Sequence, residues 1–203
     1  MYVRPSHQPR DRADVVRVIR DNMFATLITY SRGRMIATHL PFVFNETPGE
    51  YGTLYAHMAR ANSQSETLGD DEALVTFTGP HAYISPSWYD DRATAPTWDY
   101  VAVHCYGTPR VHSEDEAIRN IERLLEVVER GRPQPWSMGE LTPQEVRALV
   151  SNVVSFEIPL RQVEAKFKLS QGEKRERTAA AIVQLERQGD DTLADYMRAY
   201  NGL

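Results

Sequence analysis

The chain has 203 residues, of which 41% are hydrophobic and 25% charged, as is typical of a globular domain of ordinary size. Its net charge of -5 argues against a dedicated nucleic-acid-binding protein, because phosphate backbones select a concentrated basic face. The single cysteine excludes an internal disulfide and a cysteine-rich zinc cluster. The sequence has neither an apolar run of membrane-spanning length nor an apolar signal-peptide core, so we expect a cytoplasmic protein.

The first sixty residues are expected to form one helix and three strands. Apolar residues recur at helical spacing at the start, and the later runs are rich in β-branched and aromatic residues. The helix is expected over 11–22, capped by Asp11 or Asp14, and the strands over 24–30, 35–44 and 53–58. Residues 31–34 form a hairpin turn. Pro41 is expected to break the second strand or place it at a sheet edge, because proline cannot donate to a ladder.

The remainder of the chain alternates short strands and then turns helical. Strands are expected over 73–78, 82–85, 100–112 and 153–159, with a bulge at 107–109 in the third of these. Helical segments are expected over 61–68, 114–130, from Pro143 onward, 173–187 and 192–200, with caps at Asn62 or Ser63, Ser113 and Thr142. Six or seven evenly spaced short strands followed by helices predict an α+β fold built on an antiparallel β-barrel.

The stretch from His81 to Gly107 concentrates tryptophan, tyrosine and histidine around a loop from Ser85 to Asp99. A loop of roughly fifteen residues inside a domain is usually functional. Aromatic rings with polar tips suit a flat, heteroatom-rich ligand, which needs stacking area and a few fixed hydrogen bonds. The alternative is a hairpin whose aromatic residues cover the core, and this stretch alone does not decide between the two.

Two further segments are candidate ligand sites. Residues 55–65 run from a strand into a helix start, where unpaired N–H groups and Arg60 could cradle a phosphate; the alternative is a capped helix with an exposed arginine. Residues 37–41 form a strand broken by proline, whose free backbone groups could bind the edge of a planar ring; the alternative is an edge strand without a ligand.

Metal and serine-hydrolase chemistry are not expected. The histidines lack the His-x-His or His-x-x-x-His spacing of metal ligands, and no carboxylate pair accompanies them. No Gly-x-Ser-x-Gly sequence occurs. Cys105 lies in an apolar alternating run and is expected to be a buried small hydrophobe rather than a nucleophile.

Five sequence blocks resemble a known family. They are ATHLP (37–41), AHMARAN (56–62), GPHAYISPSWY (79–89), PTWDYVAVHCYG (96–107) and KLSQ (168–171). Together they resemble the PaiB-type proteins, described as FMN-binding negative transcriptional regulators with the flavin-binding split-barrel fold. The combination of the two aromatic blocks is specific. The resemblance implies an FMN-binding split-barrel domain over residues 1–171 and a helical extension over 172–203 packed on the same domain.

The resemblance also implies a split barrel of about six strands with flanking helices, a homodimer, and FMN at the subunit interface. The implied cofactor-binding residues are Ala37, Thr38 and His39 at the ring or ribityl chain, and Tyr55, Ala56, Arg60, Ala61 and Asn62 around the phosphate. Where pyridoxamine-phosphate oxidases of the wider fold have an Arg-Lys pair, this chain has Ala61-Asn62. Arg60 or a residue from 168–175 is then expected to supply the charge, and we include Lys168 and Gln171 in the site.

With FMN in place, the aromatic stretch is expected to stack beside the flavin or to line a second-ligand pocket, whose candidate residues are Tyr83, Trp88, Tyr89, Trp98 and His104. The resemblance suggests a negative transcriptional regulator. We expect it to act as a redox or ligand sensor that does not bind DNA directly, since no helix-turn-helix with a basic second helix is present. The alternatives are an FMN-dependent oxidoreductase acting on a small molecule and, more weakly, a haem-binding split barrel.

Overall fold

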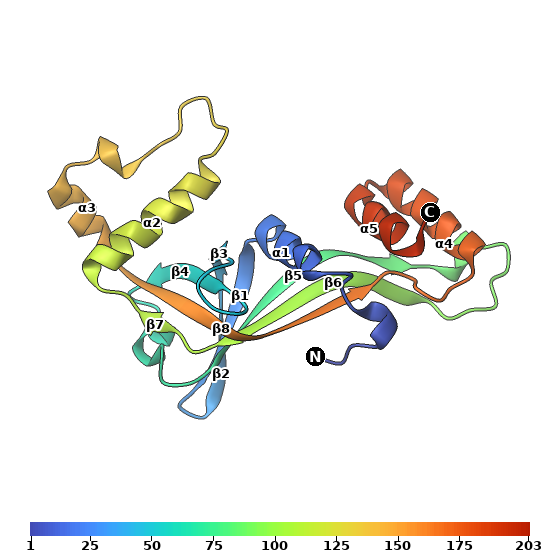
Figure 1. The fold of residues 1–203 in the computed structure, drawn as a ribbon, viewed down its shortest axis with the longest axis horizontal. Helices are drawn as coiled ribbons and strands as arrows, with labels where there is room; N and C mark the ends of the chain where they lie inside the picture. Colours follow the sequence, from blue (N-terminus) through green and yellow to red (C-terminus); the bar gives the residue numbers. More distant parts are fainter. The chain divides into compact units, whose positions relative to one another are not determined.

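The structure is a computed structural model that describes residues 1–203 (Figure 1). Its α-helices are α1 (Arg12–Asp21), α2 (Glu114–Val128), α3 (Pro143–Val150), α4 (Arg175–Gln188) and α5 (Asp191–Asn201). Its strands are β1 (Phe24–Ser31), β2 (Arg34–Pro41), β3 (Val43–Asn45), β4 (Thr53–Ala59), β5 (Ala73–Ile84), β6 (Thr97–Gly107), β7 (Arg110–Val111) and β8 (Val153–Lys168). Short 3₁₀ helices are η1 (Pro5–His7), η2 (Ser63–Thr67), η3 (Pro86–Trp88) and η4 (Met138–Glu140).

The predicted helical segments are confirmed, with the segment at 61–68 forming the 3₁₀ helix η2, and three of the predicted caps lie on α-helices. The Asp11 carboxylate accepts a hydrogen bond from the N–H of Asp14 at 2.9 Å, at the start of α1. Ser113 and Thr142 each accept from the third residue of α2 and α3, and a glutamate there returns the bond to the cap, forming a capping box. These bonds satisfy N–H groups that have no partner within the helix.

The β1–β2 hairpin and its end at Pro41 also follow the sequence pattern. The turn residues Arg32 and Gly33 have φ angles of 51° and 83°, as a type I′ turn requires. β2 ends at Pro41, and β3 pairs with β4 rather than with β1. Pro41 therefore separates two strands with different partners, and β2 lies at one end of the strand order.

Two strand predictions around the aromatic stretch are wrong in their bounds. β5 is continuous, although a break was expected at Gly79-Pro80. A Cβ at Gly79 would lie 3.1 Å from the Cβ of Val101, so the glycine allows close strand packing and does not mark a turn. β6 begins at Thr97, which shortens the expected loop to residues 85–96 and places Trp98 in a strand.

The last two strands differ from expectation for a similar reason. Residues 100–112 were expected as one strand with a bulge at 107–109. The strand instead ends there, and Pro109 separates β6 from the short β7, which pairs with β8. β8 runs to Lys168, well beyond the expected end at Pro159. A Cβ at Gly107 would lie 2.3 Å from the carbonyl oxygen of Pro159, so only glycine permits this approach.

The strands follow the order β2-β1-β5-β6-β8-β4-β3, with β7 on β8, and the sheet is not closed. The seven expected strand segments become eight strands, because prolines divide two of the expected runs and two other runs merge into β5. The predicted α+β class with an antiparallel sheet and flanking helices is confirmed. The chain forms two compact units, unit 1 (residues 1–21, 78–103 and 164–203) and unit 2 (residues 22–77 and 104–163). Strands β5, β6 and β8 contribute residues to both.

The core of unit 2 is built around three phenylalanines. The Phe42 ring meets Phe77 and Phe156 edge-on, with centroid distances of 6.1 Å and 6.4 Å. All three are at most 1% exposed. Edge-to-face pairs of this kind contribute about 0.5–1.5 kcal/mol beyond burial, so they hold β3, β5 and β8 in place.

The core of unit 1 joins α1, α4 and α5 to the end of β8. α4 and α5 lie side by side at the C-terminal end of the chain (Figure 1). The Phe167 ring stacks on Tyr200 at 5.2 Å, and the Tyr200 hydroxyl donates to Asp14 at 2.6 Å. Arg10 donates twice to the same carboxylate. None of the helices has the length and apolarity that a membrane span requires.

Candidate functional site

β2 presents the first predicted segment, residues 37–39, at a free strand edge. No strand pairs with β2 on the side away from β1. The side chains of Ala37 and His39 are exposed, and that of Thr38 is half-buried. The His39 ring stacks on Phe24 with a centroid distance of 6.3 Å. Unpaired backbone N–H and C=O groups beside a small side chain can bind the polar edge of a planar ring.

A side-chain hydrogen bond joins this strand to the second predicted segment. The Asn62 amide nitrogen donates to the Thr38 hydroxyl at 3.0 Å. The Asn62 carbonyl oxygen accepts from the N–H of Gln64 at 3.0 Å, which makes Asn62 the cap of η2, as predicted. Two segments 24 residues apart in the sequence therefore meet at Thr38 and Asn62.

Arg60 is held by backbone carbonyls. Its Nε donates to the carbonyl of Ser151 and its Nη2 to that of Val153, both at 2.7 Å. These carbonyls follow α3, where the helix dipole favours a cation. Nη1 has no hydrogen-bond partner, so the exposed guanidinium keeps donors for an anion. Arg60 therefore also holds the backbone that follows α3, a structural role that the sequence does not reveal.

Three other predicted phosphate residues lie around β4. Tyr55 and Ala56 are 8% and 3% exposed. The guanidinium of Arg123, on α2, lies 4.0 Å from the centroid of the Tyr55 ring, and the carbonyl of Ala56 accepts from Asn120 of the same helix at 2.9 Å. Ala61, by contrast, is exposed. Tyr55 and Ala56 therefore pack toward α2, whereas Ala61 leaves the backbone between Arg60 and Asn62 open to a ligand.

Gln64 is a polar residue of this region that the sequence analysis did not single out. It is 0% exposed, and its Nε2 donates to the Thr29 hydroxyl at 2.9 Å and to the carbonyl of Ile36 at 3.4 Å. Its Oε1 is buried without a partner, as is the hydroxyl of Thr67. The only indication of Gln64 in the sequence was the polar run after β4, in which this glutamine follows the Asn62 cap by two residues.

Lys168 and Gln171, the other predicted cofactor residues, belong to unit 1. Lys168 donates to the Thr97 hydroxyl and to the carbonyl of Trp98. The Gln171 amide accepts from the N–H of Leu169 at 2.7 Å and donates to the carbonyl of Phe167 at 2.6 Å. Both side chains are occupied in contacts within unit 1, and their role at a cofactor stays a prediction.

The predicted second-ligand residues fall into separate groups. Tyr83 and Trp98 are 45% and 54% exposed, and their rings meet edge-on at 6.2 Å. Trp88 and Tyr89 are half-buried around η3, where the Arg177 guanidinium lies 5.8 Å from the Tyr89 ring. Burial, with the carboxylates of Asp99 and Glu173, raises the pKa of Tyr89. The structure thus brings Tyr83 together with Trp98.

The remaining second-ligand candidate, His104, is half-buried in the part of β6 that belongs to unit 2, 6.5 Å from the Tyr106 ring. Asp99 is a buried titratable group beside Trp98 that the sequence analysis missed. Its side chain is 0% exposed, and Ser170 donates to its Oδ2, whereas Oδ1 has no hydrogen-bond partner and lies 3.7 Å from the Lys168 ammonium. Burial raises the pKa of Asp99 despite these two neighbours. The only indication that Asp99 is buried is its place in the alternation of buried and half-buried residues along β6.

Comparison with known proteins identifies the family. Residues 1–162 match the family described as "Putative FMN-binding domain". The chain belongs to this family. It is 34% identical over 187 residues to the protease synthase and sporulation protein PAI 2 of Bacillus subtilis, covering 92% of this chain and 89% of that protein. It is 28% identical to an uncharacterised protein of Emericella nidulans, with 84% of each chain covered.

Solved structures agree with the split-barrel fold. The FAD and heme binding protein from Mycobacterium smegmatis superimposes with a TM-score of 0.62 at 16% identity, covering 86% of this chain and 80% of that one. The flavocytochrome Anf3 from Azotobacter vinelandii gives a TM-score of 0.60 at 14% identity, covering 85% and 74%. The predicted PaiB-type resemblance, the split-barrel fold and FMN as cofactor are thereby confirmed.

The polar groups next to β2 fit a flavin of this FMN-binding family. Gln64 Oε1 is a buried acceptor that lacks a donor, and flavin offers donors at N3–H and at the ribityl hydroxyls. The Thr67 hydroxyl can donate to a phosphate or ribityl oxygen. Arg60 Nη1 can supply charge for the phosphate where the chain has Ala61-Asn62. These residues all lie in unit 2.

The sequence analysis expected neither a metal site nor a nucleophilic cysteine. The structure contains no group of three or more His, Cys, Asp or Glu side chains placed to hold a metal ion. Cys105 is 0% exposed, and burial raises the pKa of its thiol to about 12. The thiol therefore stays protonated and unreactive at neutral pH, which confirms its expected role as a buried small hydrophobe.

Proposed function

We propose that FMN binds along β2 and the β4–η2 turn of unit 2, and that the protein is a dimeric redox or ligand sensor in transcriptional regulation. The observation that carries the proposed site is the hydrogen bond between Asn62 and Thr38. Gln64, whose N–H donates to Asn62, lies next to this bond and has a buried Oε1 without a partner. Bound FMN supplies electron and hydride acceptance, which the protein's own side chains lack.

Within this site, each residue has a distinct task. The backbone of residues 37–39 bonds the ring edge, since β2 has no strand partner there. Asn62 holds the Thr38 hydroxyl in place, and Gln64 offers an acceptor to a ribityl O–H or to the ring N–H. Arg60 supplies positive charge to the phosphate through Nη1. Ala61 allows the phosphate to approach the backbone.

The second copy in the proposed homodimer covers the exposed face of the β1–β2 hairpin. Phe24, Tyr30 and Met35 are 69%, 56% and 66% exposed. Tyr30 faces Met35 across the hairpin, and Ile28 faces Ala37 on the same side. An exposed apolar cluster of this kind marks an interaction site, and its position beside residues 37–39 agrees with a flavin at the subunit interface.

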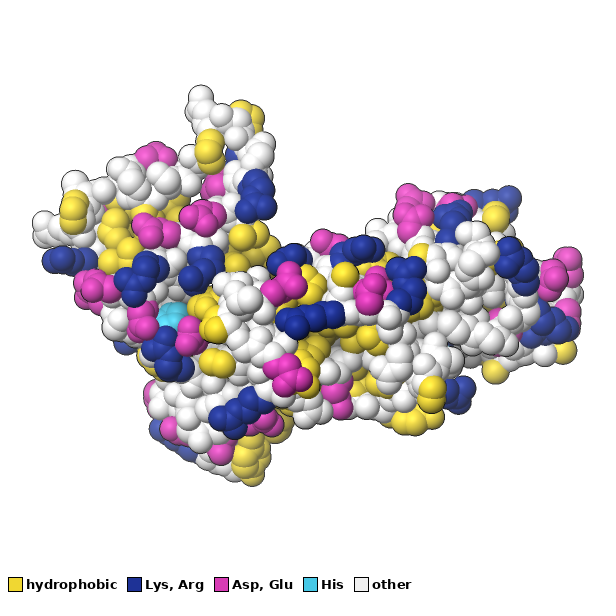
Figure 2. Space-filling view, in the orientation of Figure 1, with side chains coloured by type: hydrophobic (Ala, Val, Ile, Leu, Met, Phe, Trp, Pro, Cys, Tyr) yellow, Lys and Arg dark blue, Asp and Glu magenta, His cyan; other side chains and the backbone are white.

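The proposed regulatory role rests on the family resemblance and on charge. The name of the Bacillus subtilis relative refers to protease synthesis and sporulation, which supports a role in gene regulation. The net charge is -5, and Figure 2 shows basic and acidic side chains interspersed on the face in view. We therefore propose that a small molecule or a protein partner, in the cytoplasm, mediates the regulation and that the protein does not bind DNA directly.

The first test is the absorbance spectrum of the purified protein and its titration with FMN. Flavin bands and saturable binding are expected, whereas a Soret band would favour haem. Reduction of the bound flavin by NADH or NADPH with turnover of an acceptor would favour the oxidoreductase alternative. A protein that binds no FMN would contradict the proposed site.

The site itself is tested by Arg60→Ala combined with Asn62→Ala. Loss of the charge and of the Thr38 link is expected to weaken FMN binding by about tenfold or more, because charge-assisted hydrogen bonds are the strong ones. Arg32→Ala is the matched control, since this guanidinium is also exposed in unit 2 but pairs with Glu66. Equal affinity of both variants would place the phosphate elsewhere.

A further inference from the structure

A second cavity of unit 2 contains residues that the flavin proposal does not use. It has a volume of about 320 Å³ and lies where β7, β8 and the start of α2 meet the end of α3. Ser155 and His112 line it together with Arg60, Val111, Ser113 and Ala117. The volume is at the lower end of the range for small-molecule sites. Valine and alanine side chains form the apolar part of its lining, and Ser113, Ser151 and Glu114 add further polar groups.

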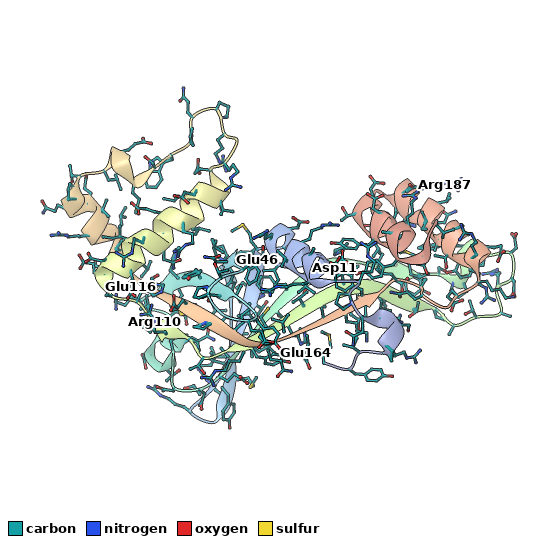
Figure 3. The ribbon with its side chains drawn as sticks, in the orientation of Figure 1. Asp11, Glu46, Arg110, Glu116, Glu164 and Arg187 are labelled. Carbon is teal, nitrogen blue, oxygen red and sulfur yellow. The ribbon has the colours of Figure 1, made fainter.

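Two side chains of this cavity, Ser155 and His112, form a chain of contacts with Glu157. The Ser155 hydroxyl lies 2.9 Å from Nδ1 of His112, and Nε2 of His112 lies 3.5 Å from Oε2 of Glu157. The His112 side chain is 3% exposed. Arg110 fixes the Glu157 carboxylate by donating from Nε at 2.8 Å, and it also donates to Glu116 at 2.9 Å (Figure 3). A hydroxyl, an imidazole and a carboxylate thus follow one another in contact.

The neighbouring hydrogen bonds determine where the protons lie. The Asn120 group that contacts the Ala56 carbonyl at 2.9 Å must be its NH₂, because a carbonyl only accepts. The same NH₂ donates to the Ser155 oxygen at 2.7 Å. Neutral His112 must carry its proton on Nε2, facing the Glu157 carboxylate, since an unprotonated nitrogen there would be repelled. Nδ1 is therefore the acceptor for the Ser155 hydroxyl, as a nucleophile and general base require.

We propose that Ser155, His112 and Glu157 form a nucleophile, base and positioning carboxylate that hydrolyse esters of short acyl groups in this cavity. The Ser155 oxygen bonds to the acyl carbon while its proton passes to Nδ1 of His112. The ester C–O bond then breaks, and the leaving alkoxide takes that proton. Water attacks the acyl-serine in the same way, which releases the carboxylic acid and restores the serine.

The surroundings of the three residues suit this chemistry. Burial lowers the pKa of His112, although the hydrogen bond and charge of Glu157 act in the opposite direction, so the imidazole is neutral at pH 7 and its unprotonated nitrogen can accept a proton. The sequence analysis expected no serine site because the residues come from β7–α2 and β8 and form no local motif.

The test exposes the purified full-length protein to a fluorophosphonate probe and to p-nitrophenyl acetate. Wild type is expected to be labelled at Ser155, as located by peptide mass spectrometry, and to hydrolyse the ester. Ser155→Ala should abolish the label, and His112→Gln should lower turnover by about 10²- to 10⁴-fold. Glu157→Gln should lower kcat with little change in KM, because a positioning carboxylate acts through the imidazole. Ser87→Ala, an exposed serine of unit 1, is the control.

Absence of label in wild type, labelling elsewhere, or full turnover by Ser155→Ala would overturn the proposal. If Ser155→Ala does not fold, Ser155→Cys keeps a side chain of similar size. Ser155 is itself only 3% exposed but lines the cavity, so iodoacetamide should react with this variant through the cavity and leave wild type unmodified, because Cys105 is 0% exposed. Unmodified Ser155→Cys would equally overturn the proposal. The labelling result can be told apart from the flavin result, since none of the three residues belongs to the proposed flavin site; Arg60 is the residue that lines this cavity and is also proposed to contact FMN.

Discussion

Asn62 and Gln64 place four amide atoms beside β2, and three of them have partners within the protein. The fourth, Gln64 Oε1, is buried and unpaired, which costs roughly 1–3 kcal/mol unless a donor is supplied. This cost is consistent with a Gln64 side chain whose free oxygen binds a donor of the ligand. In contrast, Lys168 and Gln171 already satisfy their hydrogen-bonding groups within unit 1.

A residue-scale prediction concerns Asp14 in unit 1. Its carboxylate is buried, and burial alone would raise its pKa. Hydrogen bonds from Arg10 and Tyr200 outweigh burial and hold the pKa below its ordinary value of 3.8. Asp14→Asn is expected to lower the free energy of unfolding by about 1–3 kcal/mol at pH 7, measured by urea denaturation.

The pH dependence follows from the direction of this shift. A carboxyl whose folded pKa is lowered contributes stability above its unfolded pKa and loses it as the pH falls through the folded pKa. The difference between wild type and Asp14→Asn should therefore shrink below about pH 3.8. Asp21→Asn, at the other end of α1, is the control and should change little. Equal stability of wild type and Asp14→Asn at pH 7 would contradict the prediction.

At the scale of elements, the sequence predicts the ends of helices and strands best where a single residue restricts the local backbone conformation. Pro41 divides β2 from β3, and Thr142-Pro143 starts α3, because each effect is local. Gly79 and Gly107 look like breaks in the sequence but are close contacts in the structure. Their role depends on Val101 and Pro159, which approach only after the strands pair, so no local pattern could distinguish a contact from a turn.

The capping box of α3 gives an element-scale prediction. The Thr142 hydroxyl lies 2.7 Å from the Glu145 carboxylate and accepts from the N–H of Glu145 at 3.4 Å. Thr142→Ala removes both bonds and is expected to cost about 1 kcal/mol of unfolding free energy. A lower urea midpoint with an unchanged m-value is the expected result. Thr142→Ser keeps the hydroxyl and should retain the midpoint; a similar loss in both variants would assign the effect to packing.

For the whole molecule, the family blocks in the sequence contain the segments proposed to bind the flavin, because each block is contiguous. Thr38 and Asn62 were in that set, and the structure brings them into contact. Gln64 was not, since its burial depends on Thr29 and Ile36 from another hairpin. The Ser155 contacts were missed for the same reason. Sites assembled from distant segments require the tertiary structure.

The last prediction addresses the proposed dimer. Met35 is 66% exposed on the β1–β2 hairpin, opposite Tyr30. Met35→Lys would bury an unpaired charge in a dimer formed by this face, so the dimer should dissociate at least about tenfold more readily in analytical ultracentrifugation. Leu149→Lys, on α3 with a side chain 55% exposed, is the matched control and should stay dimeric. If Met35→Lys remains dimeric while Leu149→Lys becomes monomeric, the interface lies on the α3 side of unit 2, and the flavin at β2 is bound by one subunit alone.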